Sequence, residues 1–145
     1  MVAKLRNRMT SEESGFTLVE LLVVMLILGL LAAIAIPSFF NQRDKARDAD
    51  AKAKVRSAQT AMETYATDHN GTYTGATPAG LQAIEDTLTG TPTLTIPAVA
   101  ADSYTVRVTS DTGNTFDIAR TAAGTTTQPC TAPGDAGCPS DGTWD

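Results

Sequence analysis

Few residues of this chain have types and spacings that could do chemistry, and they form two groups. The first is a single carboxylate, Glu20, placed inside a run of apolar residues. The second is a pair of cysteines, Cys130 and Cys138, with seven residues between them. The sequence contains no Gly-x-Ser-x-Gly motif, no metal-spaced pair of histidines and no phosphate-binding loop. We therefore predict a protein that is not an enzyme and that uses no cofactor and no metal.

The composition limits the elements that can position these residues. At 145 residues the chain allows one modest domain and is too short for a multidomain enzyme. It holds only 4 Phe, 3 Tyr and 1 Trp, but 23 threonines. The folded part must therefore be small and rich in β-branched side chains, which favour strands.

The apolar weight of the sequence lies in one early block that is long enough to cross a membrane. Every residue from 21 to 36 is apolar or Gly, and the block extends back to Phe16. That makes about 21 positions, against the roughly 20 that a spanning helix needs. The basic residues ahead of the block are Lys4, Arg6 and Arg8. Positive charge on this flank predicts that the N-terminal side faces the cytoplasm and that the rest of the chain lies outside.

The charge is unevenly distributed along the chain. The total is -5, but residues 41–56 carry a net +3 and residues 57–145 a net -8. An acidic surface repels the phosphate backbone. We therefore predict that the distal part binds no nucleic acid directly.

Three interpretations of the apolar block remain open at this point. It can be a plain single-pass anchor. It can be a secretory signal peptide, with an Ala-x-Ala element at residues 33–35 and cleavage before Ile36. Against this, the segment ahead of the block is long and contains Glu12 and Glu13, which dilute its positive charge.

The third interpretation rests on the ordered set around residues 14–23, Ser-Gly-Phe-Thr-Leu-Val-Glu-Leu-Leu-Val. This segment strongly resembles the start of a type IV prepilin, with a basic leader ending in Gly15, then Phe16, and Glu20 at the fifth position of an apolar helix. The resemblance implies that a prepilin peptidase cuts between Gly15 and Phe16 on the cytoplasmic side and that the new amine of Phe16 is N-methylated. A Gly before the cut lets the backbone enter a narrow protease cleft.

Glu20 has two roles open to it. A carboxylate inside a bilayer costs about 2.5–3.5 kcal/mol, so it needs a partner. The resemblance implies that this partner is the Phe16 amine of a neighbouring subunit, during assembly. Alternatively, Glu20 lies at the membrane interface and reaches water, because it is one turn from the start of the helix.

Gly29 and Pro37 also belong to the resemblance. Pro removes a helical hydrogen bond and Gly weakens helix propensity, so a kink at Pro37 is expected. The resemblance implies in addition that the span between them unwinds when subunits enter a filament.

The block continues into a second, amphipathic stretch of helix up to residue 68. Its apolar stripe is Ala51, Val55, Ala58, Met62 and Tyr65, with steps of 4, 3, 4 and 3. Acid–base pairs four residues apart are expected at Asp48–Lys52 and Asp50–Lys54. These charges indicate a solvated face, or, by resemblance, one that meets acidic surfaces of neighbouring subunits. The residues His69-Asn70-Gly71 end the helix, with His69 on the surface.

The remaining residues predict a small α+β head. Thr77-Pro78 looks like the start of a short helix that ends near Gly90. Strands are predicted at residues 93–96, 104–109 and 115–120, the last two joined by a turn at 111–114 as a hairpin. Three or four antiparallel strands should pack on the helix stripe.

The two cysteines predict a disulfide loop in an oxidising compartment outside the membrane. A zinc site lacks ligands, because the chain has 2 Cys and 1 distant His. The only metal alternative is a calcium site, and its candidate ligands fit no recognised loop: Asp111, Asp117, Asp135 and Asp141. Trp144 is expected to pack over the disulfide loop.

The sequence is therefore identified as a member of the type IV pilin family, as a precursor that polymerises. The expected fold is α+β: a long N-terminal helix, its hydrophobic half protruding, packed on a small antiparallel sheet. The expected parts are a leader at 1–15, a helix at 16–68 with a membrane and filament core at 16–40 and an amphipathic part at 41–68, and a head at 69–145. The resemblance implies a homopolymer, a prepilin peptidase and assembly-platform proteins as partners. It also implies residence in the cytoplasmic membrane before the surface filament.

A major pseudopilin of type II secretion is the alternative. Residues 65–73 (Tyr-Ala-Thr-Asp-His-Asn-Gly-Thr-Tyr) resemble the segment after the helix in both small pilins and major pseudopilins. Pseudopilins usually follow this with Pro, where this chain has Thr74. The disulfide favours a pilin.

Overall fold

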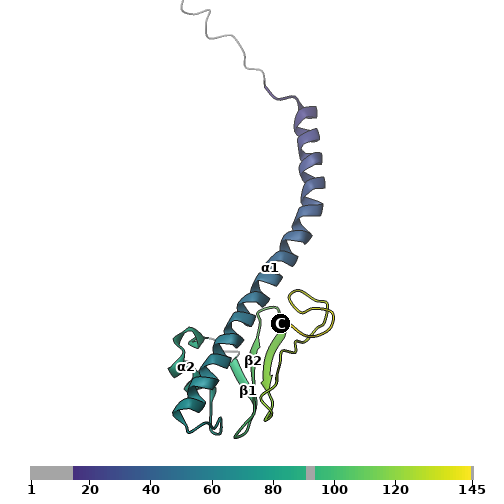
Figure 1. Cartoon of the computed structure of the whole chain (residues 1–145). Helices are drawn as coiled ribbons and strands as arrows, with labels where there is room; N and C mark the ends of the chain where they lie inside the picture. The colour runs from purple at the N-terminus through teal and green to yellow at the C-terminus, as the bar shows by residue number, and fades with distance from the viewer. Residues whose placement is uncertain (1–14, 91–93, 145) are drawn as a thin grey trace, which may run out of the picture. The chain divides into compact units, whose positions relative to one another are not determined.

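The computed structural model describes residues 15–90 and 94–144 and contains two helices, a 3-10 turn and four strands (Figure 1). In chain order these are α1 (Leu18–Asp68), α2 (Pro78–Ile84), η2 (Asp86–Leu88), β1 (Leu94–Val99), β2 (Tyr104–Thr109), β3 (Thr115–Arg120) and β4 (Thr126–Thr127). A long N-terminal helix followed by a small antiparallel sheet confirms the predicted α+β class. The first 14 residues of the expected leader, and Thr93 of the first expected strand, lie outside the described residues.

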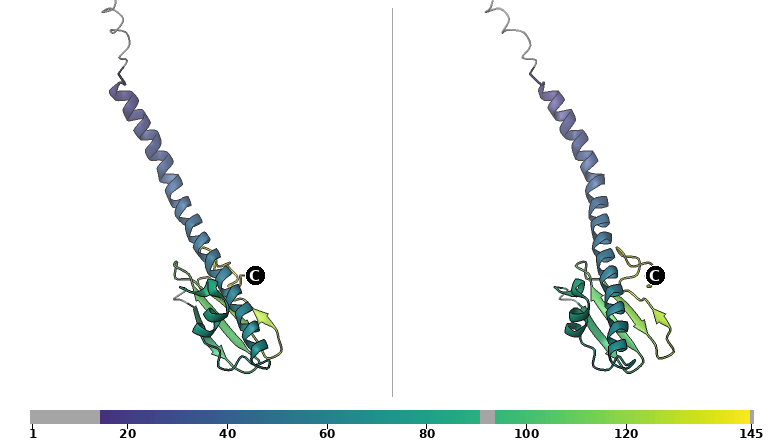
Figure 2. Two further views of the ribbon diagram at one scale, coloured as in Figure 1. Left: turned by 90° about the vertical axis from the view of Figure 1, so that its left-hand side faces the viewer. Right: turned by 60° about the vertical axis from the view of Figure 1, so that its left-hand side comes forward.

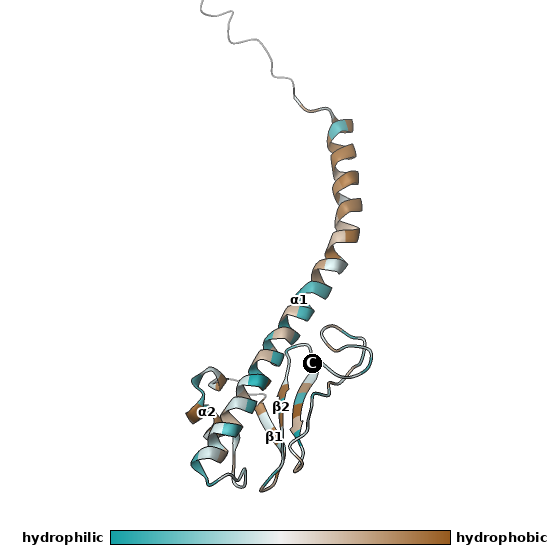
Figure 3. Cartoon of the chain, viewed as in Figure 1, coloured by the Kyte–Doolittle hydropathy of each residue, from teal (hydrophilic) through white to brown (hydrophobic). Residues whose placement is uncertain are grey.

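The chain divides into two compact units between Phe39 and Phe40. In the first unit, α1 is apolar along almost its whole length, as its brown colour in Figure 3 indicates. Every described side chain of this unit is exposed. An apolar helix with all of its faces exposed has no core of its own to join, so it requires another apolar environment.

In the second unit, the rest of α1 contributes one apolar stripe to a core shared with the sheet. Ala51, Val55, Ala58 and Met62 are buried as the periodicity predicts, whereas Tyr65 is only partly buried. The helix ends at Asp68 because Asn70 and Gly71 adopt φ of 56° and 83°, and the Gly71 N–H donates to the Ala66 carbonyl at 2.7 Å.

The sheet has the order β1-β2-β3-β4, with all neighbours antiparallel. The predicted hairpin is confirmed residue by residue: β2 pairs with β3 from Tyr104 opposite Arg120 to Thr109 opposite Thr115. Both views of Figure 2 place these strands against the second half of α1. β1 extends further than expected, to Val99. It can include Pro97 because β1 is an edge strand and because Pro97 lies at a break in the pairing register between Thr95 and Ala98.

The short helix begins as predicted but divides in two. Thr77 caps α2, its hydroxyl accepting from the Gly80 N–H at 3.1 Å, with Pro78 next to it. α2 ends at Ile84 because Glu85 is extended, and the Glu85 carboxylate accepts from the Thr87 N–H to start η2. Leu81 and Leu88 are buried, whereas Ile84 is exposed, so the apolar residues of this segment do not form one continuous buried face.

The C-terminal segment lies along the outer side of β3. The Asp117 N–H donates to the Pro129 carbonyl at 3.0 Å, and the Thr131 N–H donates to the Thr115 carbonyl at 3.1 Å. Trp144 is 2% exposed and packs edge-on against Phe116, with ring centroids 5.9 Å apart. The indole N–H donates to the carbonyls of Asp117 and Pro129. Trp144 therefore fastens the end of the chain into the core.

Candidate functional site

The start of α1 is closed by a reciprocal pair of polar side chains, Thr17 and Glu20. The Thr17 hydroxyl accepts from the Glu20 N–H at 3.2 Å. The Glu20 carboxylate accepts from the Thr17 N–H at 2.8 Å and from its hydroxyl at 2.9 Å. This is a capping box, which satisfies amide groups that the first helical turn leaves unpaired. Within this chain, the acid of the apolar block therefore has a local partner.

Gly15 and Phe16 lie just before this cap and are both exposed. Phe16 is 82% exposed, and within residues 15–90 and 94–144 nothing lies within 4 Å of the position that a Cβ would take on Gly15. None of the described residues therefore blocks access to the bond between them.

The apolar half of α1 is the one helix among the described residues that is long and apolar enough to cross a membrane. None of its apolar window is buried. The helix continues through Gly29 and Pro37 without interruption, although Pro37 has no N–H to donate to the preceding turn.

Asp48, further along α1, is the residue whose environment differs most from expectation. Its carboxylate is completely buried and accepts hydrogen bonds from the Thr112 hydroxyl at 2.6 Å, the Asn114 amide at 2.9 Å and the Gly137 N–H at 2.8 Å. The predicted Asp48–Lys52 pair is therefore wrong. Among the described residues no Lys or Arg nitrogen lies within 4.0 Å of this carboxylate.

The pKa of Asp48 is set by two opposing effects. Burial raises the pKa of this carboxyl, but hydrogen bonds from Ser110, Thr112, Asn114 and the Gly137 backbone hold the pKa below its ordinary value. Asp48 is therefore a buried anion whose charge is balanced by donors and not by a cation.

The neighbouring charges are only partly solvated. Lys54 forms the predicted pair with Asp50 at 2.9 Å. The Lys52 ammonium instead lies 5.4 Å from the centre of the Phe116 ring and 5.8 Å from that of Trp144, and the Arg56 guanidinium lies 5.2 Å from the Trp144 ring. Cations within about 6 Å of an aromatic face are attracted to it. This helix face therefore covers aromatic rings of the core.

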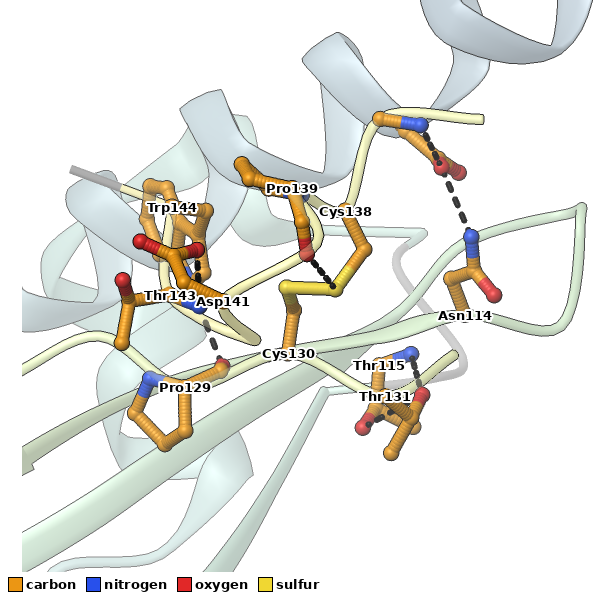
Figure 4. Close-up of a disulfide and its surroundings, with 12 residues drawn as sticks. Asn114, Thr115, Pro129, Cys130, Thr131, Cys138, Pro139, Asp141, Thr143 and Trp144 are labelled. Atoms are coloured by element: carbon orange, nitrogen blue, oxygen red, sulfur yellow. Dashed lines mark hydrogen bonds between the residues drawn. A yellow bond between two sulfur atoms is a disulfide. The ribbon is translucent and has the colours of Figure 1, made fainter. Parts of the chain in front are cut away.

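Cys130 and Cys138 form the expected disulfide, with their Cα atoms 5.8 Å apart (Figure 4). The loop between them has an unusual backbone: Ala132 and Ala136 have φ of 57° and 46°, in the left-handed region that non-glycine residues rarely adopt. Gly137 sits so close to α1 that a Cβ on it would come within 2.5 Å of the Asp48 Cβ. Glycine is therefore required at this position.

A second polar group links α1 to the sheet at the other end of the head. The Glu63 carboxylate accepts from the Tyr73 hydroxyl at 2.8 Å and the Tyr104 hydroxyl at 2.9 Å, and lies 3.8 Å from Arg120. Burial first, and then the hydrogen bond and charge of Glu63, raise the pKa of Tyr104 well above its ordinary value. The same causes raise the pKa of Tyr73. Both tyrosines are therefore held as neutral donors.

The four aspartates considered as calcium ligands do not gather. Asp117 instead accepts two hydrogen bonds from Arg107, at 2.8 and 2.7 Å. Across residues 15–90 and 94–144, no three His, Cys, Asp or Glu side chains are grouped so as to hold a metal ion. His69 is exposed, stacks on Tyr65 and contacts the Tyr65 carbonyl at 2.8 Å.

Two protein-family models match the chain and together cover most of it. Residues 11–36 match the prokaryotic N-terminal methylation motif, and residues 37–132 match a family described as type IV minor pilin ComP, DNA uptake sequence receptor. The first match includes the capped, apolar start of α1. The second match includes the rest of α1 and most of the head. No solved structure gives a significant match.

Curated relatives come from both branches considered above. The chain is 33% identical to the type IV wide pilus major component PilA4 of Thermus thermophilus, over 74% of this chain and 80% of that protein. It is 38% identical to the type II secretion system core protein G of Pseudomonas aeruginosa, over 56% of each chain. It is 31% identical to the corresponding core protein G of Escherichia coli, over 72% of this chain and 69% of that protein. The match thus spans little more than half the length of the P. aeruginosa protein.

An α+β head on a long helix, with an N-methylation motif over the start of that helix, defines a pilin-type subunit. The chain belongs to the family of type IV pilins and pseudopilins. The family is a structural one, whose members polymerise into filaments.

Sequence reasoning missed two residues of this arrangement. Thr17 was identified only as part of the prepilin segment, although Thr-x-x-Glu ahead of an apolar run is a capping-box signature. Asp48 was assigned to solvent. It lies three residues before Ala51, so the apolar stripe extended backwards by one step falls on it.

Proposed function

We propose that this protein is the structural subunit of a type IV pilus, made as a membrane-anchored precursor and polymerised through its apolar helix into a surface filament. The observation that carries the proposal is the coincidence of the N-methylation motif with the first part of α1, whose apolar side chains are all exposed. In the membrane, lipid would cover those side chains. In a filament, the same helices of neighbouring subunits would cover them.

Processing is proposed at the bond between Gly15 and Phe16, by a prepilin peptidase on the cytoplasmic side, with N-methylation of Phe16 afterwards. The exposure of Phe16 and the open space around Gly15 support this step. The cut would create a free amine on Phe16, one residue before Thr17 and four residues before Glu20, the two members of the capping box.

For Glu20 we propose an assembly role. Its carboxylate has a local partner in Thr17, which supports insertion of the monomer. A carboxylate can accept more than these bonds, so the Phe16 amine of a neighbouring subunit can pair with it without breaking the cap. We also propose that α1 unwinds between Gly29 and Pro37 when subunits enter a filament. There the helix has one residue of low propensity and one missing donor.

We propose that the basic stretch of α1 at residues 41–56 faces acidic surfaces of residues 57–145 in neighbouring subunits. Pilus assembly-platform proteins are the expected partners during polymerisation. The molecule is proposed to catalyse no reaction.

A second candidate function is that of the major pseudopilin of a type II secretion system. The observation that favours it is the likeness to core protein G of that system in P. aeruginosa and E. coli. The two functions share processing and polymerisation and differ in where the polymer lies.

Direct nucleic-acid binding by the head is not part of the proposal. The family matched over residues 37–132 is described as a DNA uptake sequence receptor. Residues 57–145 of this chain, however, carry a net charge of -8. Duplex DNA binding depends on cations that replace counterions at the phosphates, so this surface is unsuited to it.

The deciding experiment is the intact mass and N-terminal sequence of the protein in material sheared from cells. We expect a chain that starts at N-methylated Phe16, in abundant filaments. The same processed chain confined to the cell envelope would favour the pseudopilin. A start at Ile36, or an uncut Met1, would contradict both. The matched variant Glu20→Gln should be cut normally but yield few filaments.

A further inference from the structure

The two cysteines are brought together by anchors on different elements of the head. Cys130 is held by the sheet, because it forms an isolated β-bridge with Phe116 of β3. The next residue, Thr131, exchanges hydrogen bonds with Thr115, and Figure 4 shows the one that the Thr115 N–H donates. Cys138 is 2% exposed, and the residue before it, Gly137, donates its N–H to Asp48 on α1. One thiol is thus positioned by β3 and the other by the helix.

The loop between the cysteines does not adopt this backbone for local reasons alone. Ala132 and Ala136 both have positive φ, a conformation that is unfavourable for alanine. Internal hydrogen bonds, such as Gly134 N–H to Cys138 carbonyl at 2.9 Å, close small turns but do not connect the loop to the rest of the head. The Thr131–Thr115 bonds connect the start of the loop to β3, and the Asp48–Gly137 bond connects its end to α1, where the close approach leaves no room for a side chain at 137.

We propose that Asp48 is a positioning residue for the Cys130–Cys138 disulfide: by holding Gly137 against α1 it places the Cys138 thiol beside Cys130 and favours their oxidation. In that reaction the two thiols lose two protons and two electrons as the Sγ–Sγ bond forms. A low-molecular-weight disulfide, such as oxidised glutathione, accepts both and becomes two thiols. Because coupling between two equilibria is reciprocal, the disulfide in turn stabilises the seating of Gly137 on Asp48.

The test is the thiol–disulfide equilibrium of the full chain in detergent micelles, set by mixtures of reduced and oxidised glutathione. Thiols are trapped by alkylation and the oxidised fraction is read from the intact mass. The chain has only 2 Cys, so no other pairing competes. We expect Asp48→Asn to lower the equilibrium constant for the disulfide by about tenfold, the size of one hydrogen bond to a charged group. Gly137→Ala should lower it in the same direction, because the added Cβ pushes the loop off the helix.

Two matched controls separate positioning from general stability. Asp50→Asn removes an exposed acid two residues away that pairs with Lys54, and should leave the constant unchanged. Thr112→Val removes a different donor to the same carboxylate, one that does not belong to the disulfide loop, and should change the constant much less than Asp48→Asn. An unchanged constant in Asp48→Asn, or an equal fall in either control, would overturn the proposal. If Asp48→Asn is already unfolded, Gly137→Ala decides, because it keeps the carboxylate and its bonds to Thr112 and Asn114.

Discussion

The carboxylate of Asp48 accepts a hydrogen bond from the backbone N–H of Gly137, which lies 89 positions later in the chain. The same carboxylate accepts from Thr112 and Asn114 in the turn between β2 and β3. One buried anion on α1 thus connects the helix to the hairpin and to the disulfide loop.

Asp48→Ala should lower the free energy of unfolding by about 2–4 kcal/mol. The substitution removes three hydrogen bonds to a charged acceptor and leaves a buried donor on Asn114 and partly buried donors on Thr112 and Gly137 unsatisfied. Urea unfolding in micelles, followed by the fluorescence of the single Trp144, measures the loss. Asp50→Ala is the exposed control and should stay within about 0.5 kcal/mol of the wild type. An equal loss in both variants would contradict the buried role of Asp48.

The stability supplied by Asp48 should depend on pH in the acid range. Its pKa is lower in the folded than in the unfolded chain, so below the ordinary carboxyl value the unfolded state binds more protons. Its contribution is therefore complete above about pH 4 and is lost as the pH falls through the lowered folded pKa. The difference in free energy of unfolding between wild type and Asp48→Asn, measured across this range, should shrink with acidification. A constant difference would show that the charge of Asp48 does not contribute.

Tyr73 and Tyr104 should resist ionisation at alkaline pH while the head is folded. Their pKa values are raised by burial and by Glu63, so above about pH 10 the folded state holds protons that the unfolded state has released. The stability that they supply is complete below about pH 10 and is lost above it. Phenolate absorbance should therefore rise together with unfolding for these two residues. Glu63→Gln should lower the pH of this transition, and a transition unchanged in Glu63→Gln would exclude the carboxylate as a cause.

Thr17→Val should loosen the first turn of α1 without changing its shape. The valine cannot accept from the Glu20 N–H, and loss of an N-cap of this kind costs about 1 kcal/mol. Hydrogen exchange of the amides at the start of α1, in micelles, should become faster. Thr17→Ser keeps the hydroxyl and should exchange like the wild type. Equal exchange in all three proteins would mean that the capping box does not hold the turn.

Local patterns were sufficient wherever one segment decides its own conformation. The hairpin at residues 104–120, the helix stop at Asn70-Gly71 and the cap at Thr77 were all predicted from neighbouring residues. Side-chain alternation, positive φ and capping hydroxyls act within a few positions. The sequence did not predict that α2 ends before Glu85. Leu81 and Leu88 are both buried in the core of the head, but they lie on two separate helical turns and not on one face of a single helix.

The sequence by itself determined the class of protein. Gly15, Phe16 and Glu20 stand in a fixed order at the start of a long apolar block, and this order indicates the family directly. The sequence is enough here because all of these residues lie in one short segment of the chain. Only the tertiary structure decided what Asp48 does. A helix position four residues before a lysine looks like half of a surface ion pair. Its true partners, however, lie 64, 66 and 89 positions away and meet it only after the sheet and the disulfide loop have packed. The burial of a carboxylate depends on which distant donors reach it, and no local pattern contains that information.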